Sequence, residues 1–144
     1  MAENRAVRIH NGLEAIEAIE SAVVIIDVFR ASNTIISLLA AGAREVLLLA
    51  DLEQARALKR AESERPLLGE RGGVTPDDFD GGNSPANAPS SVSEGAAPIL
   101  TTSAGTQAVA RLKSADPIFF ASFANAGAVV QSLEELEPSS VTFL

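Results

Sequence analysis

The sequence predicts an α/β fold of three layers, α/β/α, with a mostly parallel or mixed sheet in a single domain spanning residues 1–144. Short aliphatic, β-branched segments alternate along the chain with segments of helical periodicity. The chain is 47% hydrophobic but has six Phe and no Trp or Tyr, so its core must be aliphatic. No internal repeat or linker divides the chain, and its 144 residues suffice for one core or most of one.

The predicted strands are short runs rich in Val, Ile and Leu. Residues 23–29, VVIIDVF, form the clearest run, and its near-continuous apolar character is typical of a strand buried on both faces. The other runs are shorter and are separated by helical segments or turns. They lie at residues 7–9, 46–50, 67–70, 98–102, 118–123 and 141–144.

The predicted helices have start and stop signals. A helix over residues 35–41 can be capped by a polar residue among positions 32–34 and ended by Gly42. Asp51 begins the next helix, which runs to about residue 62, with Gln54 placed as in a capping box. Residues 13–19 have no definite form. Two more helices are expected at residues 106–113 and 126–136.

Composition excludes several classes of function. The chain has no Cys and a single His, His10, so it contains neither a thiolate nucleophile nor a His-rich zinc centre. A net charge of −8 disfavours nucleic acid and anionic membranes as partners. No apolar run is long enough to span a bilayer, and the first five residues lack the apolar stretch of a signal peptide. We therefore expect a cytoplasmic protein.

Polar turn segments follow four of the predicted strands. They occupy residues 27–34, 69–73, 101–106 and 122–127. In open α/β sheets, ligands bind at the carboxyl ends of the strands, so we expect these segments to meet at one edge of one sheet. The stretch 71–95, dense in Gly, Pro, Ser, Asn and Asp, is too long for an idle connection and starts at the same edge.

These residue types suit phosphate chemistry. Arg30 and Arg71 can each form two parallel hydrogen bonds to phosphate or sulfonate oxygens. Carboxylates are the hard ligands that Mg²⁺ prefers, and we expect Glu70 to bind it together with Asp27 or Asp80. Backbone N–H groups in the small turns of the chain can face an oxyanion. Neither nucleotide-binding fingerprint occurs.

We assign a role to each candidate residue. The catalytic candidates are Asp27, as nucleophile or general base, with Arg30 and Arg71. The metal candidates are Glu70 and Asp80. The substrate-binding candidates are Thr101, Thr102, Gly105, Thr106, Ser122, Asn125, Asn83 and Ser84.

Plainer readings of some residues stay open. Arg30 could merely pair with Glu70 or an aspartate on the surface. Asn83 and Ser84 precede a proline and are typical turn formers. His10, on a short strand, is expected to be structural.

Five ordered blocks of sequence resemble a known family. The series resembles the 2-phosphosulfolactate phosphatases of coenzyme M biosynthesis, and the resemblance covers the chain from about residue 23 to residue 144. The blocks are DVFRASNT from Asp27, GERG from Gly69, FDGGNSP from Phe79, LTTSAGT from Leu100 and ASFAN from Ala121.

The resemblance implies a Mg²⁺-dependent hydrolase that removes phosphate from a short sulfonated hydroxy acid. Family members often have Thr-Asn-Gly-Thr-Arg where this chain has Ser-Ala-Gly-Thr-Gln at residues 103–107, which could alter substrate choice. They also continue well past the strand matching residues 141–144, so we expect the chain to lack the family's C-terminal part. A homo-oligomer is a possible consequence.

Two alternatives to this function stay open. The chain could be a non-catalytic anion-binding or assembly subunit that kept the fold and lost the chemistry. It could also be a phosphatase of the same family with another substrate.

Overall fold

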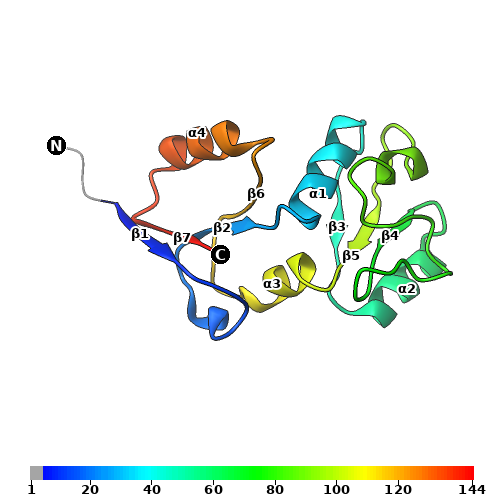
Figure 1. Ribbon diagram of the computed structural model, residues 1–144, viewed down its shortest axis with the longest axis horizontal. Coiled ribbons are helices and arrows are strands. Elements are labelled where there is room, and N and C mark those ends of the chain that lie inside the picture. The colour runs from blue at the N-terminus through cyan, green and yellow to red at the C-terminus, as the bar shows by residue number, and fades with distance from the viewer. Residues whose placement is uncertain (1–4) are drawn as a thin grey trace.

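The computed structural model describes residues 5–144 (Figure 1). Residues 1–4, which belong to the N-terminal segment discussed above, lie outside the described residues. The strands are β1 (Ala6–Ile9), β2 (Ala22–Ile26), β3 (Leu47–Leu48), β4 (Leu67–Gly69), β5 (Ile99–Thr101), β6 (Ile118–Ala121) and β7 (Ser140–Phe143). The helices are α1 (Ala31–Ala40), α2 (Leu52–Ala61), α3 (Gly105–Arg111) and α4 (Ala126–Leu136), with 3₁₀ turns η1 (Ile16–Ala18) and η2 (Ala88–Ser91).

The strands form two parallel sheets. One has the order β1-β7-β2-β6 and the other the order β3-β5-β4, and every pairing within them is parallel. The α/β class with parallel strands is therefore confirmed. We expected the four polar turns to meet at one edge of one sheet. That expectation is wrong, because β2 and β6 belong to the first sheet and β4 and β5 to the second. In Figure 1 the two sheets lie at opposite ends of the molecule, with α1 and α3 between them.

Each sheet is covered by helices on both faces, as in a three-layer arrangement. On the four-stranded sheet, Val24 packs toward α4 and its neighbour Val23 toward α3 and η1. On the three-stranded sheet, Leu68 packs toward α1 and η2, and Leu67 toward α2. Successive strand side chains alternate between faces, so only strands with apolar residues at consecutive positions can be buried in this way.

Glycine sets the spacing of β4 and β5. Gly69 ends β4 opposite Thr101 of β5, with φ of 142°. A Cβ atom on Gly69 would lie 1.9 Å from the carbonyl oxygen of Thr101, closer than any real contact. Only glycine fits, and the close approach places the next residue, Glu70, beside the carboxyl end of β5, where its N–H donates to Thr101 (3.1 Å).

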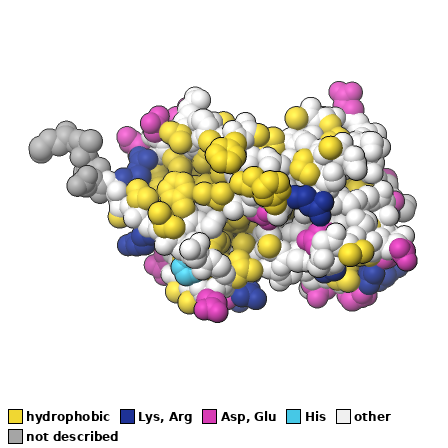
Figure 2. Space-filling view, in the orientation of Figure 1, with side chains coloured by type: hydrophobic (Ala, Val, Ile, Leu, Met, Phe, Trp, Pro, Cys, Tyr) yellow, Lys and Arg dark blue, Asp and Glu magenta, His cyan; other side chains and the backbone are white. Residues whose placement is uncertain are grey.

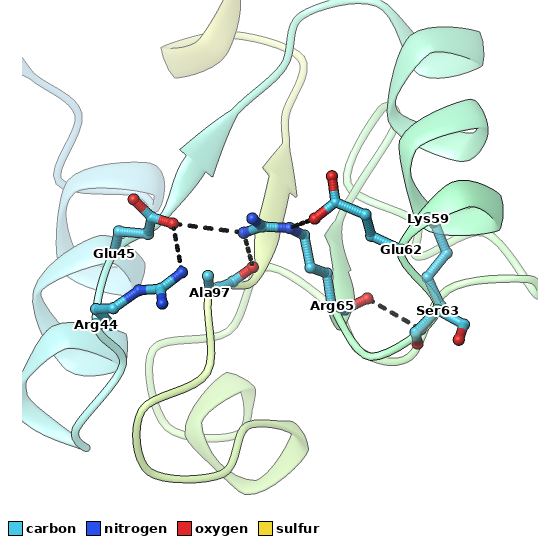
Figure 3. Close-up of polar contacts among 7 residues, drawn as sticks. All are labelled: Arg44, Glu45, Lys59, Glu62, Ser63, Arg65 and Ala97. Carbon is cyan, nitrogen blue, oxygen red and sulfur yellow. Dashed lines mark hydrogen bonds and ion pairs between the residues drawn. The ribbon is translucent and has the colours of Figure 1, made fainter.

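An ion-pair network lies at the amino ends of the three-stranded sheet (Figure 3). Arg65, just before β4, pairs with Glu62 and donates to Glu45 (3.5 Å) and to the carbonyl oxygen of Ala97 (3.1 Å). Arg44 also donates to Glu45 (3.0 Å). These basic side chains stabilise the end of the sheet that is opposite to the predicted site.

Most helix predictions are close. Asp51 caps α2 and accepts from the N–H of Gln54 (2.7 Å), which confirms the predicted cap. α1 begins earlier than predicted, at Ala31, so residues 32–34 lie inside its first turn rather than before it. The reason is that Ser32 folds back onto Asp27 within a closed turn. None of the helices in residues 5–144 has the length and apolarity needed to cross a membrane.

Candidate active site

The ends of β2, β4 and β5 form a pocket of about 310 Å³ between the two sheets, with polar and charged side chains along its wall. It contains three charged side chains, and no charged group other than these lines it among the described residues. The lining residues are Asp27, Phe29, Arg30, Glu70, Gly72, Gly73, Asn83, Thr102, Ser103 and Ala104. We call this cavity the polar pocket.

Asp27 reaches the pocket from the end of β2. Its backbone is fixed by Ser32, whose N–H donates to the Asp27 carbonyl (3.1 Å) and whose hydroxyl accepts from the Asp27 N–H (3.2 Å). Burial raises the pKa of the Asp27 carboxyl above its ordinary value, a hydrogen bond from Ala31 N–H opposes this, and the negative charge of Glu70 adds to it. Such a carboxylate is a stronger base than a solvated one.

Glycine allows α3 to approach Asp27 closely. A Cβ atom at Gly105 would lie 3.1 Å from Oδ2 of Asp27 and 2.7 Å from Cβ of Ala31. Gly105 is therefore needed for packing, as well as being the first residue of α3. Gly105 does not line the polar pocket, and its close approach leaves room for the Asp27 carboxylate; its substrate-binding role stays a prediction.

Glu70 is buried and organised by three hydrogen bonds. Oε1 accepts from the N–H of Ser103 (2.7 Å), and Oε2 accepts from the N–H of Gly73 (2.7 Å) and the hydroxyl of Ser103 (3.0 Å). Burial acts to raise the pKa of Glu70, but these hydrogen bonds, together with the charge of Arg71, outweigh it and hold the pKa below the ordinary value. Glu70 is therefore ionised and fixed in position.

Arg30 offers a cation without a protein partner. Within residues 5–144 its guanidinium makes no hydrogen bond or ion pair. Its positive charge lies close enough to Asp27 to offset part of the rise in the pKa of that carboxyl. The plainer reading, in which Arg30 pairs with Glu70, is not what the structure shows. A half-buried guanidinium at the pocket wall is suited to two parallel hydrogen bonds with phosphate oxygens.

Asn83 brings an unpaired amide to the same pocket. Its side chain is only 5% exposed, and its Oδ1 is buried without a hydrogen-bond partner in the part of the chain that the structure describes. Its carbonyl accepts from the hydroxyl of Thr34 (3.4 Å), which ties the loop to α1. Since buried polar atoms are nearly always paired, this oxygen is an acceptor left free for a water molecule, a cation or a ligand group.

Two threonines shape the turn between β5 and α3. The hydroxyl of Thr102 accepts from the N–H of Thr106 (3.1 Å), and the hydroxyl of Thr106 donates to the carbonyl of Thr102 (2.8 Å) and accepts from its N–H (3.0 Å). Thr102 lines the pocket and Thr106 lies behind it. Thr106 therefore holds the turn and does not reach a ligand in the polar pocket.

Other predicted site residues serve the framework. Arg71 donates to Glu70 O (2.7 Å), Ala50 O (3.1 Å) and the hydroxyl of Thr101 (2.6 Å), so it braces three strand ends and does not line the pocket. Asp80 accepts from the N–H of Leu67 (2.7 Å) and pairs with Lys59 (3.0 Å), which directs it away from Glu70. The predicted metal pair of Glu70 and Asp80 is thus not brought together.

Ser84, Ser122 and Asn125 also lie outside the polar pocket. Ser84 accepts through its carbonyl from Ala88 N (2.8 Å), as a turn former does. Asn125 accepts from Ser122 N (2.9 Å) and donates to Phe120 O (2.9 Å), and the hydroxyl of Ser122 accepts from Ala124 N (3.1 Å). These bonds close the turn after β6 on itself, so Ser122 does not join Asp27, Glu70 and Thr102.

The chain is similar in sequence to known proteins over most of its length. The family model described as 2-phosphosulpholactate phosphatase matches residues 9–144. The chain belongs to the 2-phosphosulpholactate phosphatase family. Two relatives, each named a probable 2-phosphosulfolactate phosphatase, come from Parasynechococcus marenigrum (41% identical over 89% of this chain and 54% of that protein) and Prochlorococcus marinus (39% over 84% and 51%). A third with the same name, from Thermotoga petrophila, is 40% identical over 79% of this chain and 49% of that protein.

The chain spans about half the length of the curated relatives that it matches. The polar pocket is nonetheless formed within the family match, because its lining residues all fall between residues 9 and 144.

The oxygen atoms of the pocket residues could supply only part of the coordination shell of a Mg²⁺ ion. The described residues contain no cluster of three or more His, Cys, Asp or Glu side chains that could hold a metal. Glu70, Asn83 and Asp27 line one pocket, and Oδ1 of Asn83 has no hydrogen-bond partner among the described residues. Mg²⁺ in enzymes often takes one or two carboxylates and completes its shell with water and substrate phosphate, so these residues fit the ion.

Sequence reasoning missed Ser103 as a site residue of this family member. Its hydroxyl donates to Glu70 and accepts from the N–H of Gly72 (3.0 Å), linking the β5 turn to the glycine turn after β4. The signal was available, because Ser103 directly follows Thr102 in the predicted turn. That its partner is Glu70, 33 positions away, depends on the β4–β5 pairing.

Proposed function

We propose that this protein hydrolyses a phosphate monoester of a small anionic hydroxy acid, converting 2-phosphosulfolactate to sulfolactate and phosphate with Mg²⁺ as cofactor. The observation that carries the proposal is the polar pocket itself, in which the unpaired Arg30 and Asn83 meet the carboxylates of Asp27 and Glu70. The names of the relatives support the choice of substrate. We further propose that the reaction belongs to coenzyme M biosynthesis and takes place in the cytoplasm.

Arg30 and Thr102 bind the phosphate in this proposal. The guanidinium donates two hydrogen bonds to phosphate oxygens, and the hydroxyl proton of Thr102, which has no acceptor among the described residues, donates a third. The Thr102 hydroxyl is held by its turn before the substrate arrives, whereas the Arg30 guanidinium, which has no protein partner, is ordered by the phosphate that it binds. Both donors then stabilise the charge that develops on the phosphoryl group.

Asp27 acts as the general base. Its carboxylate accepts a proton from a water molecule while the water oxygen forms a bond to phosphorus and the bond from phosphorus to the ester oxygen breaks. The ester oxygen leaves with the hydroxy acid and takes a proton from solvent. Glu70 and Asn83 are the residues that would hold Mg²⁺, which when bound neutralises phosphate charge.

The decisive experiment measures phosphate release from 2-phosphosulfolactate by the purified protein. We expect activity that is abolished by EDTA and restored by Mg²⁺, and a loss of roughly 100-fold or more in Arg30→Ala. Arg60→Ala is the matched control, because Arg60 is exposed on α2 and lies outside the pocket. Equal activity in the two variants would contradict the proposal.

The same assay tests the alternative functions. Saturable binding of orthophosphate with no release from any phosphorylated hydroxy acid would identify a non-catalytic anion-binding subunit. Release from a different ester would identify a phosphatase of the family with another substrate.

A further inference from the structure

A short piece of the long loop after β4 runs beside β4 as an additional strand. The N–H of Asp80 donates to the carbonyl of Leu67 (2.9 Å), and the N–H of Gly69 donates to the carbonyl of Gly81 (3.1 Å). Leu68 and Gly81 form a parallel bridge between the two segments. A Cβ atom on Gly81 would lie 2.8 Å from the side chain of Leu68, so glycine permits this close pairing. The loop therefore joins the β4 edge of the three-stranded sheet.

The register of this pairing decides where the following loop residues lie. Leu68 is opposite Gly81, so two residues further along both segments Glu70 is opposite Asn83. Both residues line the polar pocket, and Oδ1 of Asn83 is the buried acceptor without a partner among the described residues. A slip of one residue would bring a neighbour of Asn83 to this position and turn the side chains to the other face. Strand pairing therefore places the Asn83 amide at the pocket.

Asp80 fixes this register because it bonds to β4 through its side chain as well as its backbone. Its Oδ2 accepts from the N–H of Leu67 (2.7 Å) and pairs with Nζ of Lys59 on α2 (3.0 Å). Burial acts to raise the pKa of Asp80, but the Leu67 N–H and the charge of Lys59 outweigh it and hold the pKa below its ordinary value. The ionised Asp80 thus bonds both backbone groups of Leu67 in a single register.

Helix α2 supplies a fixed cationic support for the loop. Figure 2 shows basic and acidic side chains intermixed over the part of the molecule that holds α2. Lys59 also donates to the carbonyl oxygens of Ser63 (2.8 Å) and Arg65 (3.0 Å), so it is held independently of the loop. Arg56 donates two hydrogen bonds to Asp78 (2.7 and 2.8 Å), which attach the loop to α2 at a second point.

We propose that Asp80 is a positioning residue for the polar pocket: by fixing the register of the additional strand, it holds Oδ1 of Asn83 where a Mg²⁺ ion can bind it together with Glu70. Asp80 does not line the pocket, so it acts through Asn83 and is not itself a metal ligand. The part of the proposal that concerns Mg²⁺ rests on the proposed function. The part that concerns the place of Asn83 does not.

Calorimetric titration of the chain with Mn²⁺ alone tests the proposal. Asp80→Ala should bind Mn²⁺ about tenfold more weakly than the wild type, as is usual when the support of a metal ligand is removed. Asp80→Asn keeps an oxygen acceptor for the Leu67 N–H and loses only the charge, so its affinity should fall about threefold. Affinities equal to that of the wild type in both variants would overturn the proposal. If Asp80→Ala does not fold, as circular dichroism would show, Asp80→Asn carries the test.

Asp51→Ala is the matched control. The Asp51 carboxylate also accepts one backbone N–H at 2.7 Å, from Gln54, and it lies at the start of α2, outside the pocket. Its loss lowers the stability of the fold, as the loss of a helix cap does, but should leave Mn²⁺ affinity unchanged. An equal fall in affinity in Asp51→Ala and Asp80→Ala would mean that lost stability alone explains the effect, which would overturn the proposal.

A double-mutant cycle distinguishes positioning from general support of the fold. Asn83→Ala should weaken Mn²⁺ binding, and adding Asp80→Asn to it should cause no further loss, because the effect of Asp80 passes through Asn83. Losses that add in the double variant would show that Asp80 acts on the pocket by another route, and the proposal would fail.

The side-chain amide of Asn83 gives a readout that needs no metal. Its two N–H signals in a ¹⁵N–¹H correlation spectrum can be assigned by their absence from Asn83→Asp. They should move in Asp80→Asn and stay in place in Asp51→Ala. Unmoved signals in Asp80→Asn would overturn the positioning role. If the signals move but the wild type binds no Mn²⁺, the Mg²⁺ part of the proposed function fails and the positioning role stands, so the two failures are distinguishable.

Discussion

The turns that follow β5 and β6 occupy equivalent positions at the carboxyl ends of parallel strands, yet they do different things. After β5, Ser103 uses its N–H and its hydroxyl to hold Glu70, a residue from another strand. After β6, Ser122 and Asn125 bond only to their own turn. The difference is one of partners, because the turn after β5 bonds to Glu70 at the end of its neighbour β4, whereas the described residues show no hydrogen bond from the turn after β6 to the end of its neighbour β2. Adjacent polar strand ends therefore do not make a site by themselves, because β2 and β6 are also neighbours and only the end of β2 contributes to the polar pocket.

The largest expected effect comes from removing the base between the two sheets. Asp27→Asn should lower kcat for phosphate release by ~10³-fold, within the range for general acid–base catalysis. Steady-state kinetics of phosphate release check this, with Asp51→Asn as the control because Asp51 caps α2 away from the pocket. A loss of less than about tenfold would assign the base elsewhere.

The second-largest effect is expected from a substitution that disrupts the β4–β5 pairing, on which the Ser103–Glu70 contact depends. Gly69→Ala places a Cβ against the carbonyl of Thr101, so we expect the free energy of unfolding to fall by about 3 kcal/mol, typical of overpacking plus a strained φ. Urea denaturation measures it. Gly127→Ala on α4, where a Cβ meets nothing within 4 Å, should instead be neutral or stabilising by up to ~1 kcal/mol. Equal effects at the two glycines would be evidence against the close approach.

A serine pair compares the two turns directly. Ser103→Ala removes one hydrogen bond to Glu70 and one acceptor for Gly72, and kcat/KM should fall about tenfold, equivalent to ~1.4 kcal/mol. Ser122→Ala should leave kcat/KM within about twofold and cost only ~1 kcal/mol of stability, the value of one hydrogen bond within a turn. The reverse ranking would place the ligand at β6.

The smallest expected effect concerns pH. Burial raises the folded-state pKa of Asp27, so its ionisation destabilises the fold as pH rises through that pKa. Without metal, Asp27→Asn should therefore raise Tm at neutral pH, and this gain should vanish at a pH below the ordinary aspartate value of 3.8, where the wild-type carboxyl is protonated in both states. Thermal melts in EDTA at neutral and acidic pH measure it. A lower Tm for Asp27→Asn than for the wild type at neutral pH would mean that the ionised Asp27 carboxylate stabilises the folded state.

Sequence patterns predicted the elements better than they predicted the site. Aliphatic runs located every strand within residues 5–144, and the Asp51 cap was recognisable because capping is local. The division into two sheets was missed, since the order of strands depends on pairing between distant segments. Asp27, Arg30, Glu70 and Thr102 converge as expected.

Arg71 and Asp80 have residue types that suit a site, but both side chains form hydrogen bonds with backbone groups at strand ends. Residue type alone cannot distinguish a ligand-binding arginine from a bracing one. The distinction depends on which carbonyl oxygens lie within reach, and the fold decides that.

A crystal structure with Mn²⁺ and orthophosphate tests the central claim most directly, because Mn²⁺ replaces Mg²⁺ at oxygen-rich sites and gives an anomalous signal. We predict one metal peak in contact with Glu70 and Oδ1 of Asn83, and a phosphate held by the guanidinium of Arg30 beside Asp27. A phosphate bound instead in the turn of Ser122 and Asn125, with an empty polar pocket, would contradict it.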